Sequence, residues 1–367
     1  MAVRIQGSTP KQDGFHMPAE FEKQERIFMI WPERPDTWRE NAEPAQRAYA
    51  EVAKAILQFE PVTMLVSAKQ YEACGQQLPK EITLVKLPSN DAWARDTGPT
   101  FLVNEHGERR ACDWKFNAWG GFVDGLFAPW DEDDRIAGRI CELTGTDSYR
   151  TENFVLEGGS FHVDGEGTVL TTEMCLLSKG RNPQLSKAEI EDSLKQYLGA
   201  KKVLWIREGI DPEETNGHID DVACFIRPGE VACIFTEDPE NPFYRVANES
   251  FRQLSEMKDA EGRRLKVYPL CCPKKAVRLP DNFKLTESMD AKTRKPGDLC
   301  IASYMNFLIV NGGVIVPQYD DENDAFALRQ VQAMFPKRRV VGVSTREIVY
   351  GGGNIHCITQ QLPSVNK

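Results

Sequence analysis

The chain has 367 residues, 41% of them hydrophobic and 27% charged, which is typical of a globular protein with a substantial core. No apolar run approaches the roughly 20 residues of a membrane span, and residues 1–15 lack the apolar core of a signal peptide. The net charge of −10 argues against nucleic acid as a partner and weakly favours a small cationic ligand, although acidity also serves solubility alone.

The ten cysteines are scattered, with no CxxC pair and only Cys271 and Cys272 adjacent. This usage predicts reduced thiols in the cytoplasm rather than a disulfide framework. Neither CxxC nor HExxH spacing is present, so no metal and no other cofactor is expected.

Apolar periodicity predicts helices and strands in a recurring order. In chain order these are a strand at 26–31, a helix at 44–59, a strand at 62–66, a hairpin at 100–116, a helix at 131–144, a hairpin at 160–172, a helix at 186–198 opened by a capping box, a strand at 203–206, a hairpin at 222–235, a helix at 243–257, a strand at 265–268, a hairpin at 306–318, a helix at 324–335 and a strand at 339–343.

Five helices and four hairpins in alternation suggest radial repetition, as in a propeller. A strand containing Cys357 and the strand at 26–31 would supply the missing hairpin and close the ring by pairing the two ends of the chain. A doubly wound α/β sheet is the alternative, but such sheets do not expect repeated hairpins.

Reactive side chains precede the first strand of several hairpins. Because equivalent strand ends converge on the axis of a radial fold, we expect these side chains to meet although they are far apart in sequence. The predicted cluster is Asp96, Glu157, His218, Asp220 and Cys357.

Cys357 follows the glycines 351–353, of which Gly352 and Gly353 permit unusual backbone conformations and close approach of another group. A cytosolic cysteine acts as a nucleophile when a histidine and carboxylates lie nearby. The alternative is that Cys357 is a small buried core residue.

Elimination among the five histidines favours His218, which follows a glycine and is flanked by acids. A hydrogen-bonded structural histidine is the alternative at this position. The others have simpler explanations: a polar N-terminal segment for His16, a turn for His106, strand packing for His162, and for His356 a strand position that turns its side chain away from the face of Cys357.

Asp220 and Asp221 are expected on opposite faces of a strand, with one facing the site, and Asp96 is expected beside it. A local salt bridge between Arg95 and Asp96 is the alternative. Two carboxylates converging in a buried pocket require a cation, and a guanidinium offers them paired hydrogen bonds.

A mechanism follows as a hypothesis. The thiolate of Cys357 attacks the guanidinium carbon while Asp96 and Asp220 stabilise the positive charge, and that charge favours the thiolate. His218 protonates the departing ammonia and then deprotonates the water that hydrolyses the intermediate, and Glu157 orients His218.

These residues and several flanking motifs resemble the agmatine deiminases of the guanidine-modifying superfamily over nearly the whole chain. The motifs are at 17–20, 31–33, 90–99, 117–121, 156–165, 216–221 and 351–361. The resemblance implies a single five-bladed α/β propeller domain over 1–367 that hydrolyses agmatine to N-carbamoylputrescine and ammonia in putrescine metabolism, without a metal. It also implies a covalent amidino intermediate on Cys357, substrate contact by Glu214, and a homo-oligomer, a dimer or a tetramer.

Because agmatine has no α-carboxylate, we infer that Glu214 meets its distal ammonium. Trp93 and Trp119 are expected to wall the aliphatic chain, with core packing as the alternative. The runner-up activities are arginine deiminase and amidinotransferase. Other classes are a metalloenzyme with His218, Asp220 and Cys357 as ligands, and a non-catalytic binding propeller.

Overall fold

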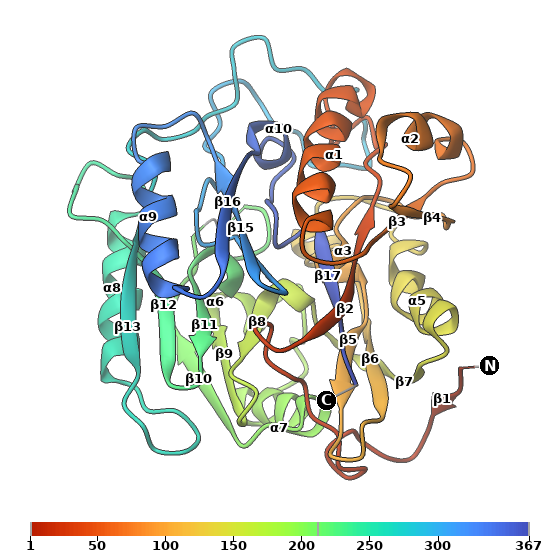
Figure 1. The fold of residues 1–367 in the computed structure, drawn as a ribbon, viewed down its shortest axis with the longest axis vertical. Helices are drawn as coiled ribbons and strands as arrows, with labels where there is room; N and C mark the ends of the chain where they lie inside the picture. Colours follow the sequence, from red (N-terminus) through yellow and green to blue (C-terminus); the bar gives the residue numbers. More distant parts are fainter. Residues whose placement is uncertain (1, 211–212, 366–367) are drawn as a thin grey trace.

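The computed structural model describes residues 2–210 and 213–365, which form a mixed α/β fold with five small sheets (Figure 1). One unit occurs five times: an antiparallel strand pair, a helix, and a third strand parallel to the second strand of the pair. The units are β5 (Thr100–Val103), β6 (Arg109–Lys115), α5 (Ile136–Thr144), β7 (Asp147–Val155); β8 (Phe161–Val163), β9 (Thr168–Thr172), α7 (Lys187–Leu198), β10 (Lys202–Ile206); β11 (Ala223–Arg227), β12 (Glu230–Phe235), α8 (Tyr244–Glu256), β13 (Lys266–Cys271); β14 (Leu308–Val310), β15 (Gly313–Gln318), α9 (Asp324–Met334), β16 (Arg339–Ser344); and β17 (Thr359–Pro363), β2 (Gln24–Ile30), α1 (Glu43–Leu57), β3 (Val62–Val66).

The two ends of the chain build the fifth unit together, as the sequence predicts. β17 lies antiparallel to β2, with Gln360 opposite Phe28, and β2 continues through α1 into β3. All four predicted hairpins and all five predicted helices are confirmed. Sequence periodicity missed β7 and the additional elements β1 (Arg4–Ile5), α2 (Tyr71–Gln77) and β4 (Thr83–Lys86).

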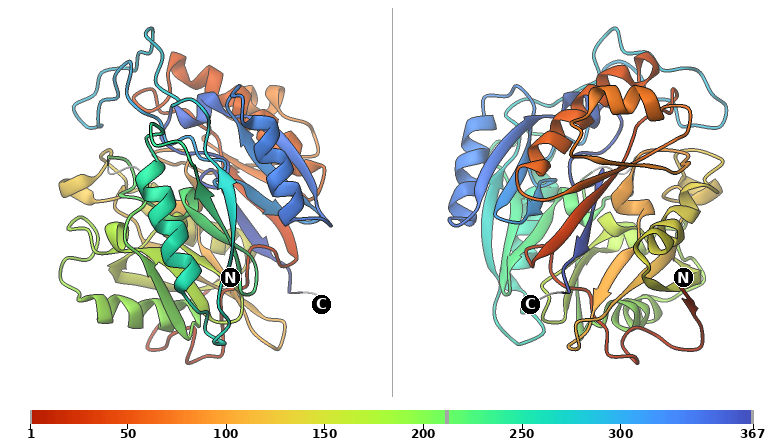
Figure 2. Two further views of the ribbon diagram at one scale, coloured as in Figure 1. Left: turned by 90° about the vertical axis from the view of Figure 1, so that its left-hand side faces the viewer. Right: turned by 45° about the vertical axis from the view of Figure 1, so that its right-hand side comes forward.

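The long helices lie on the outside of the sheets, as Figures 1 and 2 show from three directions. In α1, Tyr49, Val52 and Ile56 recur at helical spacing and are fully buried, so one face of the helix packs inward. All five residues of β3 are buried because this strand lies inside its sheet and is covered on both faces.

Short segments before the first strand of three of the units are in contact with one another. They are α3 (Ala94–Thr97) before β5, the 3₁₀ turn η3 (Gly158–Ser160) before β8, and the 3₁₀ turn η4 (Ile219–Asp221) before β11. Two predictions are corrected here. Cys357 lies in a turn before β17 and not in a strand, and Asp220 and Asp221 lie in η4 and not on opposite faces of a strand.

The long connection between β13 and β14, residues 272–307, contains little helix or strand and extends at one end of the molecule (Figure 2). Backbone hydrogen bonds hold it to distant segments, from Ala128 to Asp290 and from Lys292 to Leu126. No helix in the described ranges has both the length and the apolar character needed to cross a bilayer.

The predicted capping box at the start of α7 is present and gives a test of the local structure. Ser186 Oγ accepts the amide hydrogen of Glu189, whose carboxylate accepts the Ser186 amide at 2.8 Å. We expect Ser186→Ala to lower the free energy of unfolding by about 1 kcal/mol, measured by urea denaturation. Ser193→Ala in the middle of α7 is the control and should cost less, because alanine is the better helix former; equal losses would contradict the capping role.

Candidate active site

Three of the predicted side chains meet at Gly159. A Cβ atom added there would lie 2.6 Å from His218 Nδ1 and 2.9 Å from both Asp220 Oδ2 and Asp96 Oδ1. The Gly159 amide also donates to Asp96 Oδ1 at 2.8 Å. Any side chain at this position would push the cluster apart, which explains the glycine in the motif at 156–159.

Cys357 completes the cluster from the turn before β17. Its Sγ lies 3.6 Å from Asp220 Oδ2 and 3.2 Å from Asn306 Nδ2. Asn306 Oδ1 accepts the amides of His356 and Cys357, which directs the NH₂ group of Asn306 toward the sulfur. Burial, followed by the charges of Asp220 and Asp221, raises the pKa of Cys357 well above its ordinary value, so the thiol form is favoured.

His218 is completely buried among carboxylates. Its Nε2 lies 3.5 Å from Glu157 Oε2 and its Nδ1 lies 3.9 Å from Asp96 Oδ2, and neither ring nitrogen has a hydrogen-bond partner in the described part of the chain. Burial lowers the pKa of His218, but Asp96, Cys175 and Glu157 together outweigh it, and the pKa is raised well above the ordinary value. The imidazolium form is therefore favoured.

Glu157 is ionised in this arrangement. Its Oε1 accepts from Arg181 Nε at 3.2 Å, and both side chains are completely buried. Burial raises the pKa of Glu157, but Arg181 and His218 together lower it by a larger amount, so the net shift is downward. Glu157 thus presents its second oxygen to His218 as an anion.

Asp96 is held by neutral donors. Trp119 Nε1 donates to its Oδ2 at 2.8 Å, and the Gly159 amide donates to its Oδ1. Burial raises the pKa of Asp96. The alternative of a local Arg95–Asp96 salt bridge is wrong for the described residues, because the Arg95 guanidinium lies 3.9 Å from Glu20 Oε2 instead.

Asp220 has one engaged oxygen and one without a partner. His356 Nδ1 lies 2.8 Å from Oδ2, whereas Oδ1 has no hydrogen-bond partner within the described ranges. Burial raises the pKa of Asp220, but His356, together with His218 and Arg95, lowers it by more, and the net shift is downward. The prediction that His356 points away from the site is wrong, because it rested on strand alternation in a segment that is a turn.

A cavity of about 600 Å³ lies next to this cluster, and its walls include Trp93, Trp119, Glu214 and Gly352. The two indole rings meet edge to face with centroids 6.3 Å apart. Both tryptophans also belong to the hydrophobic core, so each lines the cavity with one part of its surface and packs in the core with another. A Cβ at Gly353 would lie 2.5 Å from the Trp93 ring and 3.1 Å from Cys357 Cβ, so only a glycine backbone separates the wall from the sulfur.

Glu214 is on the cavity wall and forms a two-point ion pair with Arg294 from the connection between β13 and β14. Arg294 Nε donates to Oε1 at 2.7 Å, and Nη2 donates to Oε2. Gly352, with φ of +106°, lies directly against this pair. Glu214 is therefore near the turn that carries Cys357, but its carboxylate is engaged by an internal guanidinium.

Three groups in the described chain bring three metal-ligating atoms within 4.8 Å of one another: Glu20, His162 and His356; Glu157, Cys175 and His218; and Asp220, Asp221 and Cys357. The trio considered from the sequence, His218, Asp220 and Cys357, is not among these groups.

Sequence reasoning missed Asn306, Glu20 and His356. The sequence pattern places Asn306 inside the first strand of the predicted hairpin at 306–318, whereas in the structure it precedes β14, just as Asp96 precedes β5. Glu20 belongs to the motif at 17–20 but has no signal in the strand and hairpin pattern, because it lies in an irregular segment before β2 and reaches the site only through the tertiary fold.

Comparisons with known proteins identify the family to which the chain belongs. The Porphyromonas-type peptidyl-arginine deiminase family matches residues 16–363. A solved agmatine deiminase of Enterococcus faecalis is 63% identical, with a TM-score of 0.98 over 99% of this chain and 100% of its own. The agmatine deiminase of Ectopseudomonas mendocina is 50% identical over 359 residues, 97% of this chain and 98% of its own. The agmatine deiminase of Pseudomonas aeruginosa is 49% identical over 362 residues, 98% of each. The chain therefore belongs to the agmatine deiminases, within the Porphyromonas-type peptidyl-arginine deiminase family of the guanidine-modifying (pentein) superfamily.

Proposed function

We propose that this protein is an agmatine deiminase, a hydrolase that converts agmatine and water to N-carbamoylputrescine and ammonia. The observation that carries the proposal is a pair of buried carboxylates, Asp96 and Asp220. They meet His218 at Gly159, and Cys357 Sγ lies 3.6 Å from Asp220 Oδ2. Asp96 has only neutral hydrogen-bond donors in the described chain, and Asp220 has an unpartnered oxygen. A planar cation with several N–H groups would satisfy both.

Agmatine would enter through the cavity with its guanidinium first. The guanidinium would bind between Asp96 and Asp220, and the aliphatic chain would pass Trp93 and Trp119. The distal ammonium would reach Glu214, which requires Arg294 to yield part of its ion pair. The positive charge of the substrate would counteract the acids that hold the pKa of Cys357 high, so binding would promote the thiolate.

The chemistry would proceed in two steps. The thiolate adds to the guanidinium carbon, and the carbon–nitrogen bond to one terminal nitrogen breaks as His218 gives that nitrogen a proton, releasing ammonia. The thiouronium on Cys357 is then attacked by water, from which His218 takes a proton. Breaking the carbon–sulfur bond gives the ureido product and restores the thiol. Glu157, anchored by Arg181, would orient His218 and keep it basic.

We also propose the domain organisation, cellular location, pathway and oligomeric state of the protein. The five sheets are taken as blades of a single propeller domain over 1–367, supported by the repeated unit and by the pairing of β17 with β2. The free thiols support a cytoplasmic location. The ureido product places the enzyme in putrescine metabolism, and a homo-oligomer, dimer or tetramer, remains our expectation, with no nucleic acid partner and no cofactor.

Cys357→Ser tests the nucleophile. A serine hydroxyl is a far weaker nucleophile than a thiolate, so agmatine turnover should fall by about three orders of magnitude or more. A colorimetric assay for the ureido product, run with agmatine and with arginine, measures this loss. Undiminished turnover by the variant would exclude Cys357, and preferential turnover of arginine would favour arginine deiminase activity.

Glu214→Gln tests the ammonium site. Loss of the carboxylate should raise KM for agmatine about tenfold while changing kcat less, because the charge lies away from the reacting carbon. Glu208→Gln is the matched control, since Glu208 also lines the cavity and pairs with an arginine, Arg245, but is more exposed. A similar KM for both variants would remove Glu214 from the substrate site.

The raised pKa of Cys357 predicts how the empty enzyme reacts with iodoacetamide. Because only the thiolate reacts, labelling should be slow near pH 7 and still increase above about pH 9, beyond the ordinary thiol range. Asp220→Asn removes one of the charges that raise this pKa and should shift the profile to lower pH. Peptide mapping identifies label on Cys357; a rate independent of pH across this range would contradict the assignment.

A further inference from the structure

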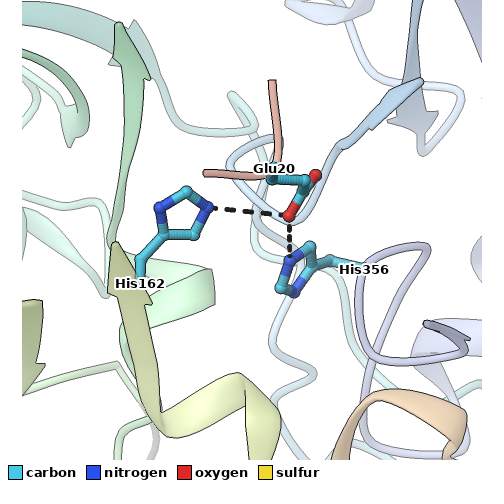
Figure 3. Close-up of side chains that lie close together, drawn as sticks. All are labelled: Glu20, His162 and His356. Atoms are coloured by element: carbon cyan, nitrogen blue, oxygen red, sulfur yellow. Dashed lines mark hydrogen bonds and ion pairs between the residues drawn. The ribbon is translucent and has the colours of Figure 1, made fainter. Parts of the chain in front are cut away.

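A buried chain of charged groups lies behind Asp220 and is not used by the chemistry proposed above. His356 stands between Asp220 and Glu20, with Nδ1 2.8 Å from Asp220 Oδ2 and Nε2 2.8 Å from Glu20 Oε2. Figure 3 shows Glu20 between His356 and His162, whose Nε2 lies 3.6 Å from the same oxygen. All four side chains are buried.

The hydrogen-bond partners of His162 and His356 determine which of their ring nitrogens carry protons. His162 Nδ1 accepts the amide hydrogen of Phe225 at 3.2 Å, so a neutral His162 carries its proton on Nε2, toward Glu20. His356 meets a carboxylate at each ring nitrogen, and ionised carboxylates only accept hydrogen bonds. Two donated bonds require the imidazolium form, in agreement with the raised pKa of His356.

Glu20 is positioned and ionised so that it binds the His356 imidazolium. Its second oxygen accepts the Ile309 amide at 2.8 Å, and Arg95 lies 3.9 Å away. Burial raises the pKa of Glu20, but His356 and its other partners bring the net shift well below the ordinary value. The carboxylate therefore stays ionised and fixes the ring that bonds Asp220.

We propose that His356, held by Glu20, is a positioning residue that keeps Asp220 ionised and turns its unpartnered Oδ1 toward the substrate guanidinium. The inference rests on the proposed function and deepens it, because it assigns the affinity of the guanidinium site to two residues that do not contact the substrate. The engaged oxygen, Oδ2, cannot rotate away without breaking a charge-assisted hydrogen bond.

The charged and titratable groups around Asp220 and His356 come from several elements and fix the sign of the pH dependence. They are Glu20, Arg95 and Asp96 of α3, His162 of β8, His218 and Asp221 beside Asp220, and Cys357. Burial raises the pKa of Asp220, and without the imidazolium of His356 this pKa would be lowered chiefly by His218 and Arg95. The carboxylate would then be protonated more readily as the pH falls and would lose the guanidinium.

The test measures agmatine binding by calorimetry in the full-length Cys357→Ser protein, where no turnover occurs. Adding His356→Asn should raise Kd about tenfold near pH 7, the effect of losing a hydrogen bond to a charged group. Adding His162→Asn is the matched control. It removes an imidazole that is as buried as His356 and lies beside Glu20 but does not contact Asp220. It should change Kd by less than about twofold.

The pH dependence separates positioning from a structural role. As the pH falls from about 8 to about 5.5, the His356→Asn protein should lose affinity more steeply than its parent, because it lacks the imidazolium that lowers the pKa of Asp220. Glu20→Gln, a nearly isosteric change, is the second variant and should raise Kd in the same direction by a smaller factor. Thermal melting confirms that each protein is folded.

These measurements distinguish failure of the proposed function from failure of the positioning role of His356. If the Cys357→Ser parent does not bind agmatine and the unmodified chain does not turn it over, the proposed function itself is overturned. If the parent binds agmatine but both His356→Asn and Glu20→Gln keep its Kd and its pH profile, only the positioning role is overturned.

Discussion

The charge balance of the buried pocket around Cys357 is the constraint on which the site depends. Buried carboxylates require partners, and most here have a protein cation: Glu157 has Arg181, and Glu20 has Arg95 and His356. Asp96 is bonded by neutral donors and lies 3.9 Å from His218, and Asp220 retains an unpartnered oxygen within the described chain. Among the described residues, the pocket thus leaves Asp96 without a charged hydrogen-bond donor and Asp220 with one free acceptor oxygen, which a planar guanidinium with several N–H donors can satisfy.

The fold makes this pocket by repeating one unit and bringing into contact the short segments that precede the first strand of three of the units. Backbone without side chains then allows the close approach, since Gly159 sits against three reactive groups and Gly353 separates Trp93 from Cys357. Trp119 has a left-handed φ of +64°, unusual for a tryptophan, while its indole bonds Asp96. Strain of this kind persists where surrounding contacts hold the residue in place, and it aligns the cavity wall with the carboxylate.

Local patterns were sufficient for much of the fold. The hairpin of β8 and β9 was predicted because its turn residues and apolar strands are contiguous, and α7 because its capping box is local. β7 was missed because it buries polar residues such as Arg150, which is satisfied by Asp113 and Asp134 from other segments. Hydrophobic periodicity does not detect burial achieved through ion pairs.

The sequence by itself determined which residue types precede each hairpin, and therefore which sulfur, imidazole and carboxylates were available to meet. Only the tertiary structure decided how those side chains face. The turn at 355–358 shows why: its His356 and Cys357 amides are bonded by the side chain of Asn306, 50 and 51 residues away in sequence. That long-range bond replaces strand alternation and directs His356 toward Asp220 and Glu20, a direction that no local pattern contains.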